Sequence, residues 1–311
     1  MRTTSIIGAL GALLATAPSA LAEWYDRPMA VAGGKGIWRD LDRRPGAPLT
    51  KGDLWRTVAA IPGGIVPAAP AYPRAPATIG DLHRAFVRAL DLPDTAAGVT
   101  AGLRAAGLEP PRGAGSEIVA RTLGLHYNRP PSRDSEEPRA SDVATRSDAA
   151  YAFWKVLRHD GSEVAYAREK LWALSLPRAA DGRRRMLQAA VAQIGEPYVW
   201  GGESRAEGGF DCSGLVVYSL ADHPWLHGRT TFDMSRVPLG ERLPIAAIAA
   251  GDLVFFGDRG SFSKPRQVDH MGIALGNGWM INAGGQGVTL ERLDAPWWAP
   301  RAAWGRRPPP L

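Results

Sequence analysis

The sequence has little cysteine and no long apolar run after its N-terminus. Its 311 residues contain one cysteine, Cys212, which excludes an intrachain disulfide. No later apolar stretch reaches the roughly 20 residues of a membrane-spanning helix. Arginine and lysine are scattered, and no zinc-finger, helix-turn-helix or RNP-type signature occurs, so we expect no nucleic-acid partner. The chain is expected to be globular, and its single thiol is either a packing residue or a reactive group.

The first 22 residues have the pattern of a bacterial secretory signal peptide. Arg2 supplies the positive end, residues 6–17 are apolar, and Ala20-Leu21-Ala22 is a small-x-small cleavage site. An uncleaved membrane anchor is the alternative, but the apolar run is short for one. We therefore expect a secreted or wall-associated protein without a transmembrane segment once residues 1–22 are removed.

Length and composition favour two domains. A chain of 311 residues exceeds the usual size of one domain, and 45% hydrophobic residues supply a core. We place the boundary at the charged, proline-containing stretch 177–185, between a mainly helical accessory domain (23–180) and a second domain (184–307). The net charge of +6, or +5 without Arg2, suits contact with anionic wall polymers or membrane surfaces. An ordinary basic surface would give the same charge.

Three segments of the first domain begin alike. Thr50, Thr78 and Thr145 are each followed three residues later by aspartate and then by apolar residues at helical spacing, which predicts a capping box at each start. The segments resemble helices of S-layer-homology modules, most closely at Thr145-Arg-Ser-Asp148. That resemblance implies repeats that bind secondary wall polymers. Three ordinary capped helices would give the same pattern.

The single cysteine lies at a predicted helix start. Glycines 208 and 209 precede it, Asp211 suits the N-cap, and residues 215–220 continue at helical spacing. A thiol on the first turn of a helix has a lowered pKa, which favours the thiolate. We therefore interpret Cys212 as a reactive group, with a buried structural cysteine as the alternative.

A predicted hairpin supplies possible partners. Strands 268–275 and 279–283 flank Gly276-Asn277-Gly278. If this turn is a three-residue loop, residue 272 faces Asn282 and His270 shares their face. A two-residue loop would place Asn282 on the opposite face. In the first register the histidine and asparagine are diagonal neighbours across the two strands.

Cys212, His270 and Asn282 could then act as one catalytic unit. The imidazole takes the thiol proton, the amide orients the ring, and the thiolate attacks a carbonyl carbon to form a thioester that water hydrolyses. Backbone N–H groups at the helix start could hold the oxyanion. Taken singly, His270 would be a structural strand histidine and Asn282 a hydrogen-bonding core residue.

We expect no metal and no cofactor. His223 and His227 have a metal-like spacing of four residues. Pro224 lies between them, however, and the glutamate of the H-E-x-x-H motif is missing.

Residues 184–307 contain several motifs in a fixed order. They are Pro197-Tyr-Val-Trp-Gly-Gly202, Phe210-Asp-Cys-Ser-Gly-Leu-Val216, Gly251-Asp-Leu-Val-Phe-Phe256, His270-Met-Gly-Ile-Ala-Leu-Gly-Asn-Gly278 and Met280-Ile-Asn-Ala283. With these motifs, residues 184–307 resemble the NlpC/P60 family of papain-like cysteine peptidases. The resemblance implies an α+β catalytic domain, with helices packed on an antiparallel sheet, that cleaves peptidoglycan stem peptides at the bond from γ-D-glutamate to a diamino acid.

The resemblance also assigns roles to single residues. It implies Cys212 as nucleophile, His270 as base and Asn282 as the third polar residue, a position that is often histidine in the family. The residues implied to contact the substrate are Tyr198, which lines the cleft, and Asp211 and Ser213, which touch the stem peptide. A core aromatic and two helix-capping groups are the alternative reading of these three.

Two other functions fit the same sequence. One is an amidase or acyl transferase, in which an amine resolves the thioester. The other is a non-catalytic wall-binding protein. The loop 257–269 is longer than the family's short connection, so the sequence leaves cleft shape and the diamino acid open.

Overall fold

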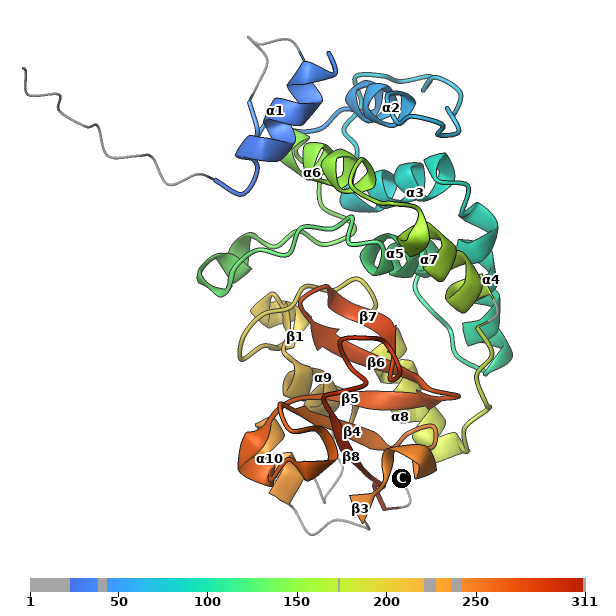
Figure 1. The fold of residues 1–311 in the computed structure, drawn as a ribbon, viewed down its shortest axis with the longest axis vertical. Helices are drawn as coiled ribbons and strands as arrows, with labels where there is room; N and C mark the ends of the chain where they lie inside the picture. Colours follow the sequence, from blue (N-terminus) through green and yellow to red (C-terminus); the bar gives the residue numbers. More distant parts are fainter. Residues whose placement is uncertain (1–22, 39–43, 173, 221–227, 237–241, 310–311) are drawn as a thin grey trace, which may run out of the picture.

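The chain folds into a helical part followed by a part built on one antiparallel sheet (Figure 1). The structure is a computed structural model that describes residues 23–38, 44–172, 174–220, 228–236 and 242–309. The predicted class is thereby confirmed: a mainly α-helical region precedes helices packed on an antiparallel sheet. The signal-like residues 1–22 and the pair His223 and His227 lie outside the described residues.

The first part consists of helices joined by loops. Its helices are α1 (Asp26–Gly34), α2 (Lys51–Ala59), α3 (Ile79–Ala89), α4 (Pro93–Ala105), α5 (Ala114–Thr122), the 3₁₀ helix η2 (Pro131–Glu136), α6 (Arg146–Val156) and α7 (Ser162–Trp172). Among the described helices, none is long and apolar enough to cross a membrane.

The three predicted capping boxes all form, at the starts of α2, α3 and α6. The extended residues just before these helices are joined in a closed triangle of backbone hydrogen bonds. The amide of Leu49 donates to Ala144 (2.7 Å), that of Ala144 to Ala77 (2.9 Å) and that of Ala77 to Leu49 (2.8 Å). The three starts therefore occupy equivalent places around an approximate threefold centre, which favours internal repeats over unrelated capped helices.

The second part contains α8 (Asp181–Val191), α9 (Cys212–Ser219), α10 (Thr231–Arg236) and six strands in the order β3-β8-β4-β5-β6-β7. The strands are β3 (Arg242–Leu243), β8 (Ala302–Arg306), β4 (Leu253–Gly257), β5 (Val268–Gly276), β6 (Trp279–Gly284) and β7 (Gly287–Arg292), and β1 (Glu203–Ser204) and β2 (Gly209–Phe210) form a separate pair. Between β4 and β5 lie the 3₁₀ turns η5 (Gly260–Phe262) and η6 (Pro265–Gln267), and the turns η3 (Arg205–Glu207) and η4 (Ile245–Ala247) complete the part.

Helix α8 begins at Asp181, inside the charged stretch 177–185 at which the sequence predicts a domain boundary. The arginines interpreted as a charged linker belong to its first turns, where Arg183 donates to the fully buried carboxylate of Asp252 (2.8 Å). Arg307 donates to the same carboxylate (2.8 Å), so one buried acid joins α8, the sheet and the C-terminal residues.

The two faces of the sheet have different cores. Apolar residues of β5, β6 and β7, such as Ile273 and Ile281, belong to the large core that also contains Leu215 and Val216 of α9. The opposite face carries a smaller cluster that is covered by Trp298. Helix α9 is thus fixed against the sheet, and its first residue lies beside β5.

The predicted hairpin register is confirmed, although the turn differs from the three-residue loop. Ile273 pairs with Ile281, which places residue 272 opposite Asn282, whereas nearer the turn Gly276 pairs with Trp279. The loop therefore has two residues, Asn277 and Gly278, both with positive φ (51° and 77°) as in a type I′ turn. A bulge between Ala274 and Gly276 absorbs the extra residue and restores the register.

Candidate active site

Helix α9 begins where the sequence predicts, with Asp211 as its N-cap. The Asp211 carboxylate accepts hydrogen bonds from the Gly214 amide (2.6 Å) and the Ser213 hydroxyl (3.0 Å). A Cβ at Gly214 would lie 1.9 Å from the carbonyl oxygen of Gly202. Glycine is therefore required here, because the first turn of the helix packs directly on the preceding loop.

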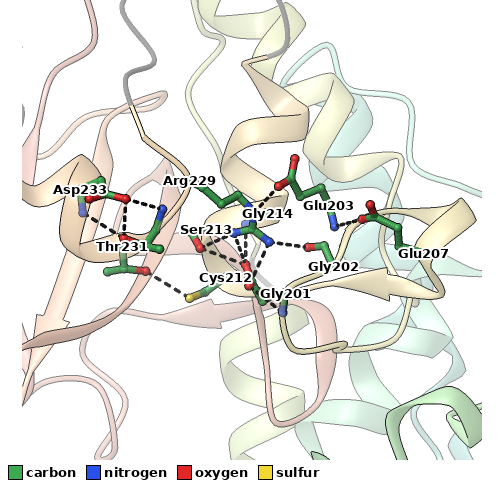
Figure 2. A network of polar contacts seen from close by, with 12 residues as sticks. Gly201, Gly202, Glu203, Glu207, Cys212, Ser213, Gly214, Arg229, Thr231 and Asp233 are labelled. Carbon is green, nitrogen blue, oxygen red and sulfur yellow. Dashed lines mark hydrogen bonds and ion pairs between the residues drawn. The ribbon is translucent and has the colours of Figure 1, made fainter.

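Arg229 stabilises the first turn of α9 through further hydrogen bonds (Figure 2). Its guanidinium donates to both carboxylate oxygens of Asp211 (3.0 Å each), to the hydroxyl of Ser213 (2.8 Å) and to the carbonyl of Gly202 (3.2 Å). It also forms an ion pair with Glu203. Bidentate guanidinium–carboxylate pairs are rigid, so the start of the helix that carries Cys212 is held on several sides.

Cys212 is buried, with 8% of its surface exposed. Its sulfur lies 3.4 Å from the Thr231 hydroxyl, and the backbone of Met271, the residue after His270, also hydrogen-bonds to it. Burial raises the pKa of the Cys212 thiol, and these hydrogen bonds oppose the rise only in part. The expectation that the helix start lowers this pKa is therefore wrong for the resting protein, because desolvation outweighs the helix dipole.

Three strands bring His270, Asn282 and Glu291 into one chain of hydrogen bonds. The Asn282 side chain is fully buried, and its Oδ1 lies 3.0 Å from His270 Nε2. Its Nδ2 donates to Glu291 Oε2 (2.8 Å). Because a carboxylate can only accept, Glu291 fixes the orientation of the amide. Oδ1 must then accept from Nε2–H, which leaves Nδ1 as the basic nitrogen of His270.

The imidazole is enclosed by aromatic side chains. The Trp298 ring stacks on it, with 4.8 Å between centroids and 24° between planes, and Phe256 lies behind it at 5.9 Å. Burial lowers the pKa of His270, and the hydrogen bond to Asn282 and the Glu291 charge act in the opposite direction. The ring is thus neutral near pH 7 and able to accept a proton.

A cleft of about 480 Å³ opens in front of His270. Tyr198, which the sequence places at the substrate, lines it together with Glu291 and Arg301. Arg301 is paired with Asp269 (2.8 Å) at the start of β5 and with Asp258 (2.6 Å) in the loop that follows β4. These ion pairs fix the loop beside the cleft.

The structure thus brings His270 and Asn282 into direct contact and places Tyr198 in their cleft. Cys212 lies next to the strand that carries His270, but its recorded side-chain partner is Thr231. Asp211 and Ser213 are 8% and 4% exposed and are bonded to Arg229 and the helix start. These contacts supply their capping role, and their contact with a stem peptide stays a prediction.

Within the described residues, no group of three or more His, Cys, Asp or Glu side chains could hold a metal ion.

The family model for NlpC/P60 matches residues 195–307, the stretch that contains every residue of this cleft. Residues 195–307 belong to the NlpC/P60 family. The match covers this stretch alone, so the domain boundaries of the whole chain stay a prediction.

Curated relatives of the NlpC/P60 region are named as endopeptidases. The chain is 36% identical over 118 residues to the bifunctional muramidase/DL-endopeptidase CwlT of Bacillus subtilis, matching 38% of this chain and 34% of CwlT. It is 36% identical over 139 residues to the murein DD-endopeptidase MepH of Escherichia coli, matching 41% of this chain and 49% of MepH. The chain therefore spans less than half the length of these relatives.

Among solved structures, the NlpC/P60 domain of the peptidoglycan hydrolase SagA is 29% identical to this chain. The match covers 40% of this chain and 97% of that domain, with a TM-score of 0.34.

Sequence reasoning missed four residues around the NlpC/P60 site: Thr231 at the thiol, Arg229 at the helix start, Glu291 behind Asn282, and Trp298 on the imidazole. The alternation in β7, where Val288 and Leu290 are buried, was a usable signal for a strand that carries Glu291. No sequence pattern around Arg229 predicts that it binds Asp211.

Proposed function

We propose that the protein is a cysteine peptidase that hydrolyses the stem peptides of bacterial peptidoglycan. The observation that carries this proposal is the chain from His270 through Asn282 to Glu291, set beside a lone cysteine at a helix start. Membership of the NlpC/P60 family and the names of the relatives support it. A role in the wall requires export, for which residues 1–22 have the expected pattern.

The proposed reaction begins with a neutral pair. The Cys212 thiol turns from Thr231 and gives its proton to Nδ1 of His270, and the sulfur attacks the scissile carbonyl carbon. Backbone N–H groups of the first turn of α9 hold the oxyanion. The C–N bond then breaks as His270 protonates the leaving amine, and a thioester remains. Water, deprotonated by His270, attacks the thioester and restores the thiol.

For the scissile bond we propose the link from γ-D-glutamate to the diamino acid. The relatives' names include both DL- and DD-endopeptidases. The cleaved bond is therefore to be identified from the reaction products. Mass spectrometry of digested peptidoglycan should show new fragments that end at γ-D-glutamate. Fragments cut between two D-residues would indicate the DD bond. Products joined to an added amine would indicate an acyl transferase, and release of intact stems from the glycan would indicate an amidase.

The pKa directions predict an unusual pH dependence. Because the pKa of Cys212 is raised above its ordinary 9.0 and that of His270 is lowered below 6.5, both groups are neutral near pH 7. Hydrolysis should therefore fall only below pH 6.5, as His270 becomes protonated, and stay level up to pH 9. The rate at which iodoacetamide alkylates Cys212 should still rise at pH 9, since the thiolate reacts. An alkylation rate that levels off below pH 7 would instead show a resting thiolate–imidazolium pair.

We further propose that the helical part holds the enzyme on anionic or secondary wall polymers. The threefold arrangement of α2, α3 and α6 supports repeated modules, as the S-layer-homology resemblance implies. Full-length Cys212→Ala protein should sediment with purified walls and be released by salt, which screens contacts between exposed charges. Walls stripped of their anionic polymers are the control. Equal retention on both preparations would argue against this role.

A further inference from the structure

A second groove, of about 460 Å³, lies between the helical part and strand β7. Gly124, Lys155 and His159 line it from the helical side, and Thr289 and Trp298 line it from the sheet side. Its volume falls within the range of about 300–1,000 Å³ that is usual for ligand sites. The groove therefore has the size of a binding site and walls from both parts of the chain.

This groove shares part of its wall with the active-site cleft. Gln286, Glu291, Trp297 and Trp298 line both cavities. Two of them hold the catalytic group in place, since Trp298 stacks on His270 and Glu291 binds the Asn282 amide. A molecule that extends from the cleft into the groove would thus contact the residues that position the imidazole.

The groove walls carry buried polar atoms without hydrogen-bond partners. They are Thr289 Oγ1, Trp298 Nε1, Gln286 Oε1 and His159 Nδ1. The Thr289 and Trp298 residues are only 3% and 7% exposed. A buried polar group without a hydrogen-bond partner is unfavourable, so the concentration of these atoms in one groove points to a ligand that completes them.

The unpartnered atoms include both donors and acceptors. Trp298 Nε1 can only donate, and Gln286 Oε1 can only accept. His159 Nε2 lies 3.1 Å from the Leu123 carbonyl and must donate to it. Burial lowers the pKa of His159, so the ring is neutral and its Nδ1 accepts. This set of donors and acceptors suits the N–H and C=O groups of a peptide backbone.

Lys155 adds one uncompensated positive charge. It is half-buried in the groove wall, and no hydrogen bond or ion pair is recorded for it among the described residues. The arginines of the groove are already paired, Arg121 with Glu117 and Arg292 with Asp294. Two carboxylates also line the groove: Glu163, which is exposed to solvent, and Glu291, which accepts a hydrogen bond from the Asn282 amide. The free ammonium group therefore favours an anionic group on the ligand.

We propose that this groove is a substrate subsite that binds a peptide arm ending in a free carboxylate, with Lys155 as its counterion. The inference rests on the proposed peptidase function and deepens it, because the helical part then takes part in substrate selection. The arm runs from the cleft at Trp298 along β7 to the ammonium group at the far wall.

Two synthetic stem peptides that differ only in a free or an amidated C-terminal carboxyl group test this proposal. The unmodified enzyme should cleave the acid with a kcat/KM about 10-fold above that of the amide, a difference worth about 1.4 kcal/mol. Lys155→Met should remove this preference by raising KM for the acid and should leave cleavage of the amide unchanged. Lys51→Met, a change to an exposed lysine at the start of α2 and outside the groove, is the matched control and should leave the cleavage of both peptides unchanged.

A second readout does not depend on turnover. The acid peptide should bind the Cys212→Ala protein about 10-fold more tightly than the amide does, as measured by calorimetry, and Lys155→Met should abolish the difference. If Lys155→Met weakens binding and cleavage of both peptides equally, Lys155 supports the fold. If the variant changes neither peptide's binding or cleavage, no carboxylate binds there. Either result overturns the subsite. If neither peptide is cleaved but the binding preference holds, the peptidase proposal fails and the subsite stands.

Discussion

Replacing Cys212 with alanine is expected to abolish peptidoglycan cleavage, with a loss of at least about 1,000-fold. The reason is chemical, because the thiolate is the nucleophile of the proposed thioester route and no other cysteine exists in the chain. Purified peptidoglycan is digested with the unmodified and the Cys212→Ala proteins, and the products are read by mass spectrometry. Fragments that end at γ-D-glutamate should come from the unmodified protein alone.

The folded state of the variant is the control. Cys212 is buried and small, so alanine should lower the free energy of unfolding by about 1 kcal/mol and leave a cooperative thermal transition. Because Cys212 is the single thiol, one equivalent of iodoacetamide on the unmodified protein should give the same loss of activity without a mutation. Cleavage that survives both treatments would refute the assignment of the nucleophile. Absence of cleavage by the unmodified protein would point to a latent enzyme or to a protein that only binds the wall.

How much the sequence could predict depended on the distance along the chain over which each interaction acts. The three capping boxes and the Asp211 N-cap join residues three apart, so local spacing was enough to find them. The partnership of His270 with Asn282 was within reach because one hairpin connects them, even though the turn itself has a different length. Family motifs extended these local predictions to a complete domain.

Interactions between segments that are distant along the chain could not be predicted from the sequence. Arg229 reaches Asp211 across 18 positions of sequence, and Glu291 reaches Asn282 because of the β6–β7 register. The groove wall at Lys155 comes from a different part of the chain than Thr289. The pKa of Cys212 was mispredicted for the same reason, since the burial that raises it is supplied by packing on the sheet. Tertiary packing, which spacing does not report, determines each of these features.

Replacing Asn282 with alanine is expected to lower kcat by about 100-fold and to change KM little. The amide does not contact the substrate in the proposed reaction, but it fixes the ring and tautomer of His270, and a loss of alignment of about 1 Å costs about 100-fold in rate. Glu291→Gln should give a smaller loss of about 10-fold, because a neutral amide at this position allows the Asn282 side chain to flip. Both variants are measured with one soluble stem peptide.

The pH dependence of kcat/KM distinguishes two roles of Asn282 and Glu291. These residues either position the imidazole of His270 or only support the fold. The hydrogen bond that His270 donates to Asn282 and the Glu291 charge both raise the pKa of His270 against the effect of burial. Removing either should therefore lower this pKa further and move the acid limb of kcat/KM to lower pH. Glu169→Gln, a change to an exposed glutamate on α7, should leave both the rate and the acid limb in place. A uniform loss of activity with an unmoved acid limb in the Asn282 and Glu291 variants would show that these residues support the strands and do not orient the base.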